Sequence, residues 1–132
     1  MSEASAQAEV VRRFYGAFND QDLDGFVATL HPDAELQTAR GLRSGRIEAR
    51  EWATKTPVGS LDQRLVLEQV RERGNHAVAL YRKQWWWRET DRLAREDEMA
   101  AMFTFEDGLI SRWQPYEDRS AALALLDELA AT

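Results

Sequence analysis

Cysteine is absent from this 132-residue chain, and histidine (two residues) and proline (three residues) are scarce. The lack of cysteine excludes disulfides, thiolate chemistry and zinc sites of the cysteine type. Acidic residues outnumber basic ones by 23 to 17, which gives a formal net charge of −6, and the arginines are scattered singly among acids. Such a surface repels a polyanion, so we expect no nucleic-acid partner.

Long hydrophobic runs are missing as well. Residues Met1 to Glu9 are polar and rich in alanine, and they lack the basic start and apolar stretch of a secretory signal. No segment approaches the length that a transmembrane helix needs. We therefore expect a cytoplasmic protein with no membrane partner.

What is present is an ordinary globular composition, with 44% hydrophobic and 30% charged residues. A chain of this length is close to the commonest domain size and can bury a sizeable core. We interpret residues 1–132 as one domain that begins with a flexible segment at residues 1–7. The five tryptophans are less ordinary and draw attention to an aromatic core or pocket.

Apolar residues at helical spacing predict four helices, whose limits are set by capping residues, proline and glycine. Pro32 disfavours helical geometry at His31, so the second helix ends there and an extended segment follows. The expected elements are helices at 8–19 and 22–30, an extended segment at 34–40, a loop bracketed by Gly41 and Gly45, a helix at 46–56, and a last helix from Asp118 or Ser120 through Leu129.

The middle of the chain is mostly strand, because it is rich in β-branched and aromatic residues. Turn signals at Gly74-Asn75, Glu89 to Asp91 and Asp107-Gly108 separate the runs, and such short connections imply an antiparallel meander. Helices that precede a meander must cover one side of its sheet, which predicts an α+β fold. The expected strands are Leu61–Arg73, His76–Arg88, Glu96–Phe105 and Leu109–Tyr116.

Two groups of sequence segments, one near each end of the chain, resemble segments of a known protein family. The first runs Phe14-Tyr15-Gly16-Ala17-Phe18-Asn19, Asp22-Leu23-Asp24-Gly25-Phe26 and Leu30-His31-Pro32-Asp33-Ala34-Glu35-Leu36; the second runs Phe103-Thr104-Phe105, Asp107-Gly108-Leu109-Ile110 and Arg112-Trp113-Gln114-Pro115-Tyr116-Glu117-Asp118. In this order the strings resemble nuclear-transport-factor-2-like proteins of the SnoaL-like branch. The resemblance implies an NTF2-like cone with N-terminal helices on a curved, mainly antiparallel sheet, and a C-terminal helix.

The catalytic positions of ketosteroid isomerases are replaced in this chain. Those enzymes use a carboxylate base together with a tyrosine and a protonated aspartate. The resemblance places Thr38, Phe14 and Ala101 at these positions. None of the three moves a proton at neutral pH or donates like a carboxylic acid, so we expect no activity of this type.

Limonene-type epoxide hydrolases resemble residues 75–118 without a gap, yet their mechanism is also incomplete here. Their arginine corresponds to Arg82, but their two aspartates correspond to Gln84 and Pro115. The positions that help to hold water correspond to Leu36 and Thr38. Activation of water without a nearby carboxylate is disfavoured, so no catalytic residue is identified and no metal or cofactor is expected.

The resemblance also implies which side chains face the hollow of the cone. The expected inward residues are Leu36, Thr38, Arg82, Gln84, Trp86, Met99, Ala101, Phe103, Trp113 and Pro115, closed from the helices by Phe18, Leu30 and Trp52. A mainly apolar lining with a few polar groups is typical of a small-molecule site. Arg82 and Gln84 would donate to a carbonyl, carboxylate or enolate while the aromatic rings hold a flat body.

A simpler interpretation of the same residues stays open. The aromatic rings would then only fill the core, and Arg82 would pair with a buried acid such as Asp97. His31 is interpreted as a structural residue at a helix C-terminus, because no ligand cluster stands at metal spacing around it.

The run Trp85-Trp86-Trp87 predicts a self-association surface. Strand alternation sends Trp86 inward and places Tyr81, Trp85 and Trp87 together on the outer face of the sheet. Monomers seldom expose such an aromatic patch, and relatives of this fold commonly dimerise through it, so we expect a two-fold homodimer. The alternative is that a terminal segment covers the patch.

Three functions follow from these observations. The first is a binding module for a small hydrophobic carbonyl or acid. The second is a cyclase, isomerase or dehydratase that uses an acid-base group not yet identified. The third is a protein-interaction domain without a ligand.

Overall fold

The computed structural model describes residues 5–55 and 61–131, so the expected flexible start falls partly outside the described residues. Within them, Ser5 caps the first helix and Ala6 and Gln7 belong to its first turn. The elements in chain order are α1 (Ala6–Asp20), α2 (Leu23–Ala28), β1 (Leu30–Thr38), β2 (Gly41–Ser44), α3 (Gly45–Ala53), β3 (Leu61–Arg73), β4 (His76–Trp87), β5 (Arg92–Glu106), β6 (Leu109–Tyr116) and α4 (Arg119–Ala131).

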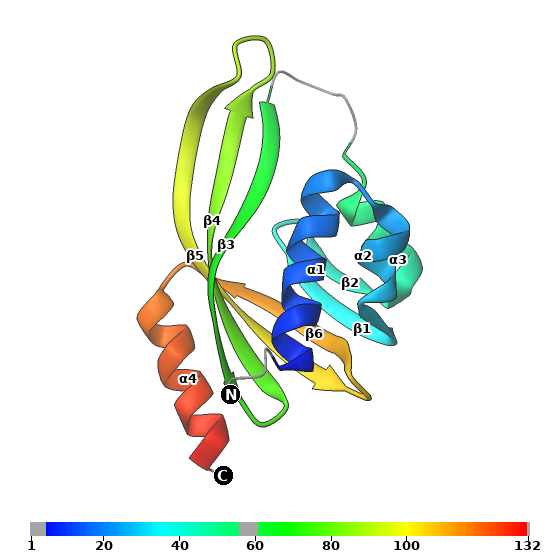
Figure 1. The fold of residues 1–132 in the computed structure, drawn as a ribbon, viewed down its shortest axis with the longest axis vertical. Helices are drawn as coiled ribbons and strands as arrows, with labels where there is room; N and C mark the ends of the chain where they lie inside the picture. Colours follow the sequence, from blue (N-terminus) through cyan, green and yellow to red (C-terminus); the bar gives the residue numbers. More distant parts are fainter. Residues whose placement is uncertain (1–4, 56–60, 132) are drawn as a thin grey trace.

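The six strands form one sheet in the order β2-β1-β6-β5-β4-β3. All neighbours are antiparallel except β1 and β6, which are parallel. Helices α1, α2 and α3 lie on one side of the sheet and α4 lies on the other (Figure 1). The expected α+β cone of the NTF2-like type, with a C-terminal helix, is confirmed.

Helices α1 and α2 begin where the sequence provides caps. The Ser5 hydroxyl accepts a hydrogen bond from the Ala8 amide at 3.1 Å, and the Asp22 carboxylate accepts one from the Gly25 amide at 3.0 Å. Helix α1 ends at Gln21, which adopts the left-handed conformation with φ 57°. The junction between the two helices is therefore fixed locally.

The region after α2 differs from the sequence-based expectation. The second helix ends at Ala28, and β1 begins at Leu30 because the Ile110 amide donates to the Thr29 carbonyl at 2.9 Å and starts a parallel ladder. His31 consequently lies in a strand, and its interpretation as a residue at a helix C-terminus is wrong. The segment from Gly41, expected as a loop, is strand β2 paired with β1 in a hairpin. Gly41 has φ 108°, a conformation that favours glycine at this turn.

The β4–β5 hairpin is longer than expected, because β5 begins at Arg92 rather than at Glu96. Its turn is held by the Asp91 amide, which donates to the Trp87 carbonyl at 2.8 Å. Strands β3, β4 and β5 reach past the three N-terminal helices (Figure 1). We name residues 83–97 the finger.

The two faces of the sheet carry separate cores. On the face toward α1, the inner face, β4 contributes Ala77, Ala79 and Tyr81 to the main hydrophobic cluster. On the opposite, outer face, Val78 and Leu80 pack with Ala122 and Leu126 of α4 and with partners on β5. Alternation along β4 therefore puts its odd-numbered residues on the inner face and its even-numbered residues on the outer face.

Strand β3 is an edge of the sheet, and the side chain of Asn19 covers part of that edge. Its amide nitrogen donates to the Leu65 carbonyl at 2.7 Å, and its amide oxygen accepts from the Leu65 amide at 2.8 Å. This pair of bonds ties the end of α1 to β3 and occupies backbone groups that an edge strand leaves unpaired.

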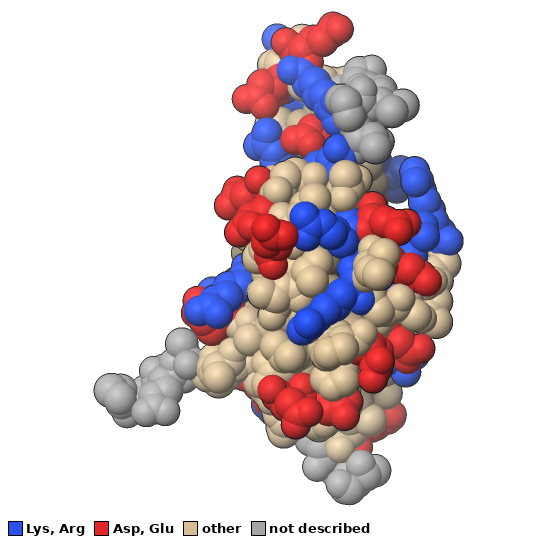
Figure 2. Space-filling view, turned by 90° about the vertical axis from the view of Figure 1, so that its right-hand side faces the viewer, with Lys and Arg blue, Asp and Glu red and all other residues tan. Residues whose placement is uncertain are grey.

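Acidic and basic side chains are interspersed over the face shown in Figure 2. Among the described residues, none of the helices combines the length and the apolar character required to cross a membrane.

Candidate functional site

Aromatic rings fill the centre of the inner face. Phe14 is fully buried, and its ring centroid lies 4.8 Å from that of Phe26, 5.3 Å from Phe103 and 5.6 Å from Trp113. These separations are normal for packed aromatic pairs. The centre of the cone is therefore a ring cluster in contact on all sides.

The ring cluster continues to a less buried tryptophan on α3. The Trp52 ring lies 5.3 Å from the ring of Trp113 and 5.3 Å from that of Phe18, while the Trp52 side chain remains only partly buried. Lys55 places its ammonium 5.1 Å from the Phe18 ring. We name the rings of Phe18, Trp52 and Trp113 the aromatic floor.

Most of the expected lining residues come together here. The main cluster buries Phe18, Leu36, Met99, Ala101, Phe103 and Trp113, with Trp52 packed against it. Thr38 is also buried, but its hydroxyl donates to the Gly41 carbonyl at 2.7 Å and so closes the β1–β2 turn. Whether a ligand contacts these side chains stays a prediction.

The placement of Arg82, Gln84 and Trp86 in the hollow is wrong, because these residues are on the outer face with Leu80. Arg82 binds Glu68 at 3.0 Å and Glu96 at 2.7 Å. Gln84 donates to Glu96 at 2.6 Å, and the Trp86 indole donates to Gln84 at 2.9 Å. Arg82 is compensated by these two glutamates and not by Asp97.

The prediction of an aromatic patch on the outer face is also wrong, because the two faces of β4 are the reverse of those expected. Tyr81 is 1% exposed on the inner face, with its ring 5.0 Å from that of Tyr15. Trp85 and Trp87 share the parity of Tyr81, and Trp87 is 45% exposed near the tip of the finger. The outer face instead carries α4, which packs on Val78, Leu80, Ala100 and Met102 and so covers a different part of the sheet from the expected patch. A homodimer stays a prediction, but an exposed outer patch of these residues no longer supports it.

The inner face of the finger carries charge that the sequence interpretation missed. Lys83 and Arg95 lie 5.0 and 5.3 Å from the ring of Trp85, and Arg95 pairs with Asp97 at 3.2 Å. Asp97 has the parity of Met99, so a carboxylate does stand on the inner face. The sequence did contain a signal for this, because Asp97 is two residues before Met99, which was expected to face inward, and residues two apart on a strand share a face.

Arg43 is a further cation on the inner face, and β2 positions it. It is directly opposite Leu36, which in turn is opposite Trp113, so these three residues form one row across the sheet. Its Nε atom is buried and has no hydrogen-bond partner among the described residues. Arg43 was missed because its segment was interpreted as a loop; a two-residue turn after Thr38 was the signal for a hairpin.

Two buried tyrosines lie between α1 and the sheet. Burial strongly raises the pKa of the Tyr15 phenol, with a further increase from Tyr81, and burial also raises the pKa of Tyr81. The Trp113 indole donates to the Tyr15 hydroxyl at 3.3 Å. Both phenols are therefore neutral at physiological pH and can act only as hydrogen-bonding groups.

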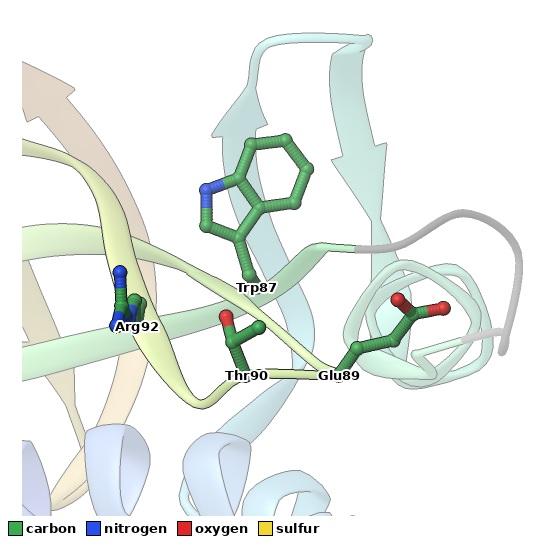
Figure 3. A pocket seen from close by; sticks show the side chains of 4 residues that line it. All are labelled: Trp87, Glu89, Thr90 and Arg92. Atoms are coloured by element: carbon green, nitrogen blue, oxygen red, sulfur yellow. The ribbon is translucent and has the colours of Figure 1, made fainter.

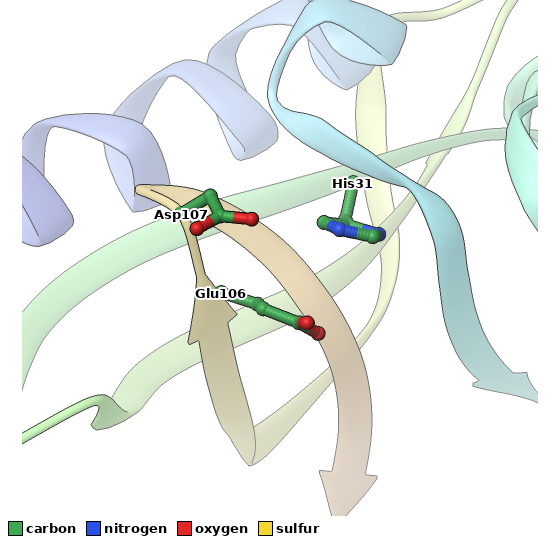
Figure 4. Close-up of side chains that lie close together, drawn as sticks. All are labelled: His31, Glu106 and Asp107. Atoms are coloured by element: carbon green, nitrogen blue, oxygen red, sulfur yellow. The ribbon is translucent and has the colours of Figure 1, made fainter.

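His31 does have acids beside it, contrary to expectation. The turn between β5 and β6 brings Glu106 and Asp107 to it, and one potential ligand atom of each residue lies within 4.8 Å of the others (Figure 4). However, His31 Nδ1 accepts from the Asp33 amide at 3.1 Å, which leaves the ring proton of the neutral histidine on Nε2. The protonated Nε2 can donate a hydrogen bond to a carboxylate, but it has no lone pair with which to bind a metal ion.

Two surface pockets lie outside the aromatic floor. One, of about 340 Å³, is at the tip of the finger and is lined by Trp87, Glu89, Thr90 and Arg92 (Figure 3). The other, of about 400 Å³, is a groove between α1 and the edge strand β3.

The family model described as a SnoaL-like domain matches residues 11–113. No curated protein sequence matches the chain. Solved structures do match it over nearly the whole length. TerC, co-crystallised with polyporic acid, has a TM-score of 0.71 at 22% identity, with 94% of this chain and 99% of that chain covered.

Two further structural neighbours have the same fold. An NTF2-like protein of unknown function from Burkholderia pseudomallei has a TM-score of 0.68 at 23% identity, with 92% of this chain and 98% of that chain covered. A putative polyketide cyclase from Xanthomonas campestris pv. campestris has a TM-score of 0.67 at 22% identity, with 92% and 96% covered. At these identities the likeness concerns the fold alone.

Proposed function

Since this chain belongs to the SnoaL-like domain family, we propose that it binds a small hydrophobic molecule with a carbonyl or acid group on the aromatic floor. The observation that carries the proposal is the partly buried Trp52, whose ring packs at a tilt against the rings of Phe18 and Trp113, with the Lys55 ammonium 5.1 Å from the Phe18 ring. A flat apolar body gains from such a surface, and a nearby cation selects a polar or anionic end.

The neighbours are consistent with this kind of ligand. TerC was co-crystallised with polyporic acid, and several others are putative polyketide cyclases. The comparison supports the class of ligand and leaves the compound itself open.

The test uses N-phenyl-1-naphthylamine, a flat neutral fluorophore, as the probe. We expect saturable binding to the wild-type protein, weakened about fivefold by Trp52→Leu because a stacking surface is lost. Trp87→Leu is the matched control, since Trp87 lines the tip pocket. If Trp87→Leu weakens binding as much as Trp52→Leu, or if no binding occurs, the aromatic floor is not the site.

A second candidate function is an enzyme of the cyclase, isomerase or dehydratase type. It is favoured by Asp97, an inner-face carboxylate that could remove a proton next to a ligand carbonyl. The developing enolate would gain from the cations on the same face. In this scheme the carboxylate takes the proton, the electron pair moves onto the carbonyl oxygen, and the proton returns in the reverse step.

Proton exchange tests this second function without a known substrate. In deuterated water, 1-tetralone should exchange the hydrogens next to its carbonyl faster with the wild-type protein than with Asp97→Asn. Glu98→Gln, on the neighbouring outer-face position, should behave like the wild type. Equal rates with wild type and Asp97→Asn would remove the basis for an Asp97-dependent reaction.

A further inference from the structure

Arg43 differs from the other partly buried arginines in having no hydrogen-bond or ion-pair partner within residues 5–55 and 61–131. The guanidinium of Arg46 donates to the Leu30 carbonyl at 2.6 and 3.0 Å. Arg119 binds Glu68 and the backbone carbonyls of Tyr81 and Met99. The buried Nε of Arg43 has no acceptor among the described residues. A buried donor without a partner is costly, and structures rarely keep one without a reason.

The position of Arg43 connects it to the aromatic floor. Its row on the inner face runs through Leu36 to Trp113, and the ring of Trp113 lies 5.3 Å from that of Trp52. Neighbouring strands are about 4.8 Å apart, so Arg43 and Trp113 are separated by roughly 10 Å at the backbone. A two-ring molecule is about long enough to cover this separation, with one end on Trp52 and the other on the guanidinium.

The acids around Arg43 do not neutralise it. Glu35 is on the opposite face of β1, as its exposed position between the buried Ala34 and Leu36 shows. Glu48 accepts a hydrogen bond from the Ser44 amide at 3.0 Å at the start of α3. No ion pair within 4.0 Å joins Arg43 to a described acid. The positive charge is therefore available to a ligand.

We propose that Arg43 receives the anionic end of the ligand, which makes the ligand class a flat organic acid, such as an aromatic carboxylate or sulfonate or an ionised hydroxyquinone. The inference rests on the proposed binding function and narrows it from a carbonyl or an acid to an acid. The Nε and one terminal nitrogen of an arginine match two oxygens of such a group in a bidentate pair. Because Nε is buried in the unliganded protein, the anion contacts it only after the groups that cover Nε move aside, and it then provides the acceptor that Nε lacks.

The experiment compares two probes that share one framework. N-phenyl-1-naphthylamine is neutral, and 8-anilino-1-naphthalenesulfonate adds an anionic group to the same rings. Arg43→Gln should weaken the sulfonate about tenfold, the usual order for a charge-assisted bond, and change the neutral probe less than about twofold. Arg112→Gln, at an exposed position, is the matched control and should change neither probe.

The outcomes separate the two proposals. If the wild-type protein binds neither probe, the proposed function fails and the inference fails with it. If both probes bind and Arg43→Gln leaves the sulfonate unchanged, or weakens both probes equally, only the role of Arg43 is overturned.

A second measurement excludes a purely structural role for Arg43. The probe-free melting temperature of Arg43→Met should equal or exceed that of the wild type, because an apolar side chain of similar length removes the unpartnered donor. A clear fall in melting temperature would show that Arg43 stabilises the fold and would overturn the inference.

Discussion

Removal of the Asn19 side chain should destabilise the protein by about 1–3 kcal/mol. Asn19→Ala deletes two hydrogen bonds to the backbone of Leu65, each with a net value of about 0.5–1.5 kcal/mol. Strand β3 is an edge, so water can reach the released amide and carbonyl and limits the loss. For a chain of this size the melting temperature should fall by roughly 3–10 °C.

Urea denaturation provides the free energy of unfolding for this variant, and amide exchange provides a local readout. The Leu65 amide should exchange faster in Asn19→Ala, because its acceptor is the Asn19 side chain. Gln69→Ala is the control on the same strand, at an exposed position, and should stay within about 0.5 kcal/mol of the wild type. A loss below about 0.5 kcal/mol in Asn19→Ala, with unchanged exchange at Leu65, would refute this account of the edge.

Three further predictions concern pH and assembly. Hydrogen bonds from Arg119 and Arg82 lower the pKa of Glu68 below its ordinary value of 4.5, so the stability they contribute is present above that value and is lost as the pH falls through the folded-state pKa. Between pH 5 and pH 3 the melting temperature of Glu68→Gln should therefore fall less than that of the wild type. Burial raises the pKa of Tyr15 and Tyr81 above 10.0, so the folded state holds their protons longer and loses stability as the pH rises through 10; Tyr81→Phe should flatten this alkaline decline, and a decline identical to that of the wild type would contradict it. Light scattering tests the homodimer, which requires a particle of twice the chain mass of 15.2 kDa. A particle with the mass of one chain would contradict it.

Much of the fold follows from local sequence signals. Strands β3 and β6 have the limits that the sequence predicts, because the glycine turns at Gly74 and Gly108 act over a few residues. Strand β1 begins earlier than predicted, since its first residues are held by β6, far away in the chain. No local pattern near Pro32 carries that information.

Local sequence signals do not show which side of the sheet each set of alternating residues occupies. Alternation correctly groups Tyr81 with Trp85 and Trp87, but it does not state which group meets the helices. That choice depends on packing, and Ala77 and Ala79 are small enough to lie beneath the aromatic rings of the inner face. A one-residue change of parity moves every side chain of β4 to the other face.

This change of parity alters the chemistry of the site more than its shape. The cation expected in the hollow, Arg82, is neutralised by glutamates on the outer face. In its place the inner face carries Arg43, whose Nε has no partner in the part of the chain that the structure describes, and Lys83 beside Trp85. Arg82 and Gln84 together predicted a site for a carbonyl, a carboxylate or an enolate. Because a cation without a described acid beside it favours an anion, replacing that pair by Arg43 supports the proposal that the ligand is an acid.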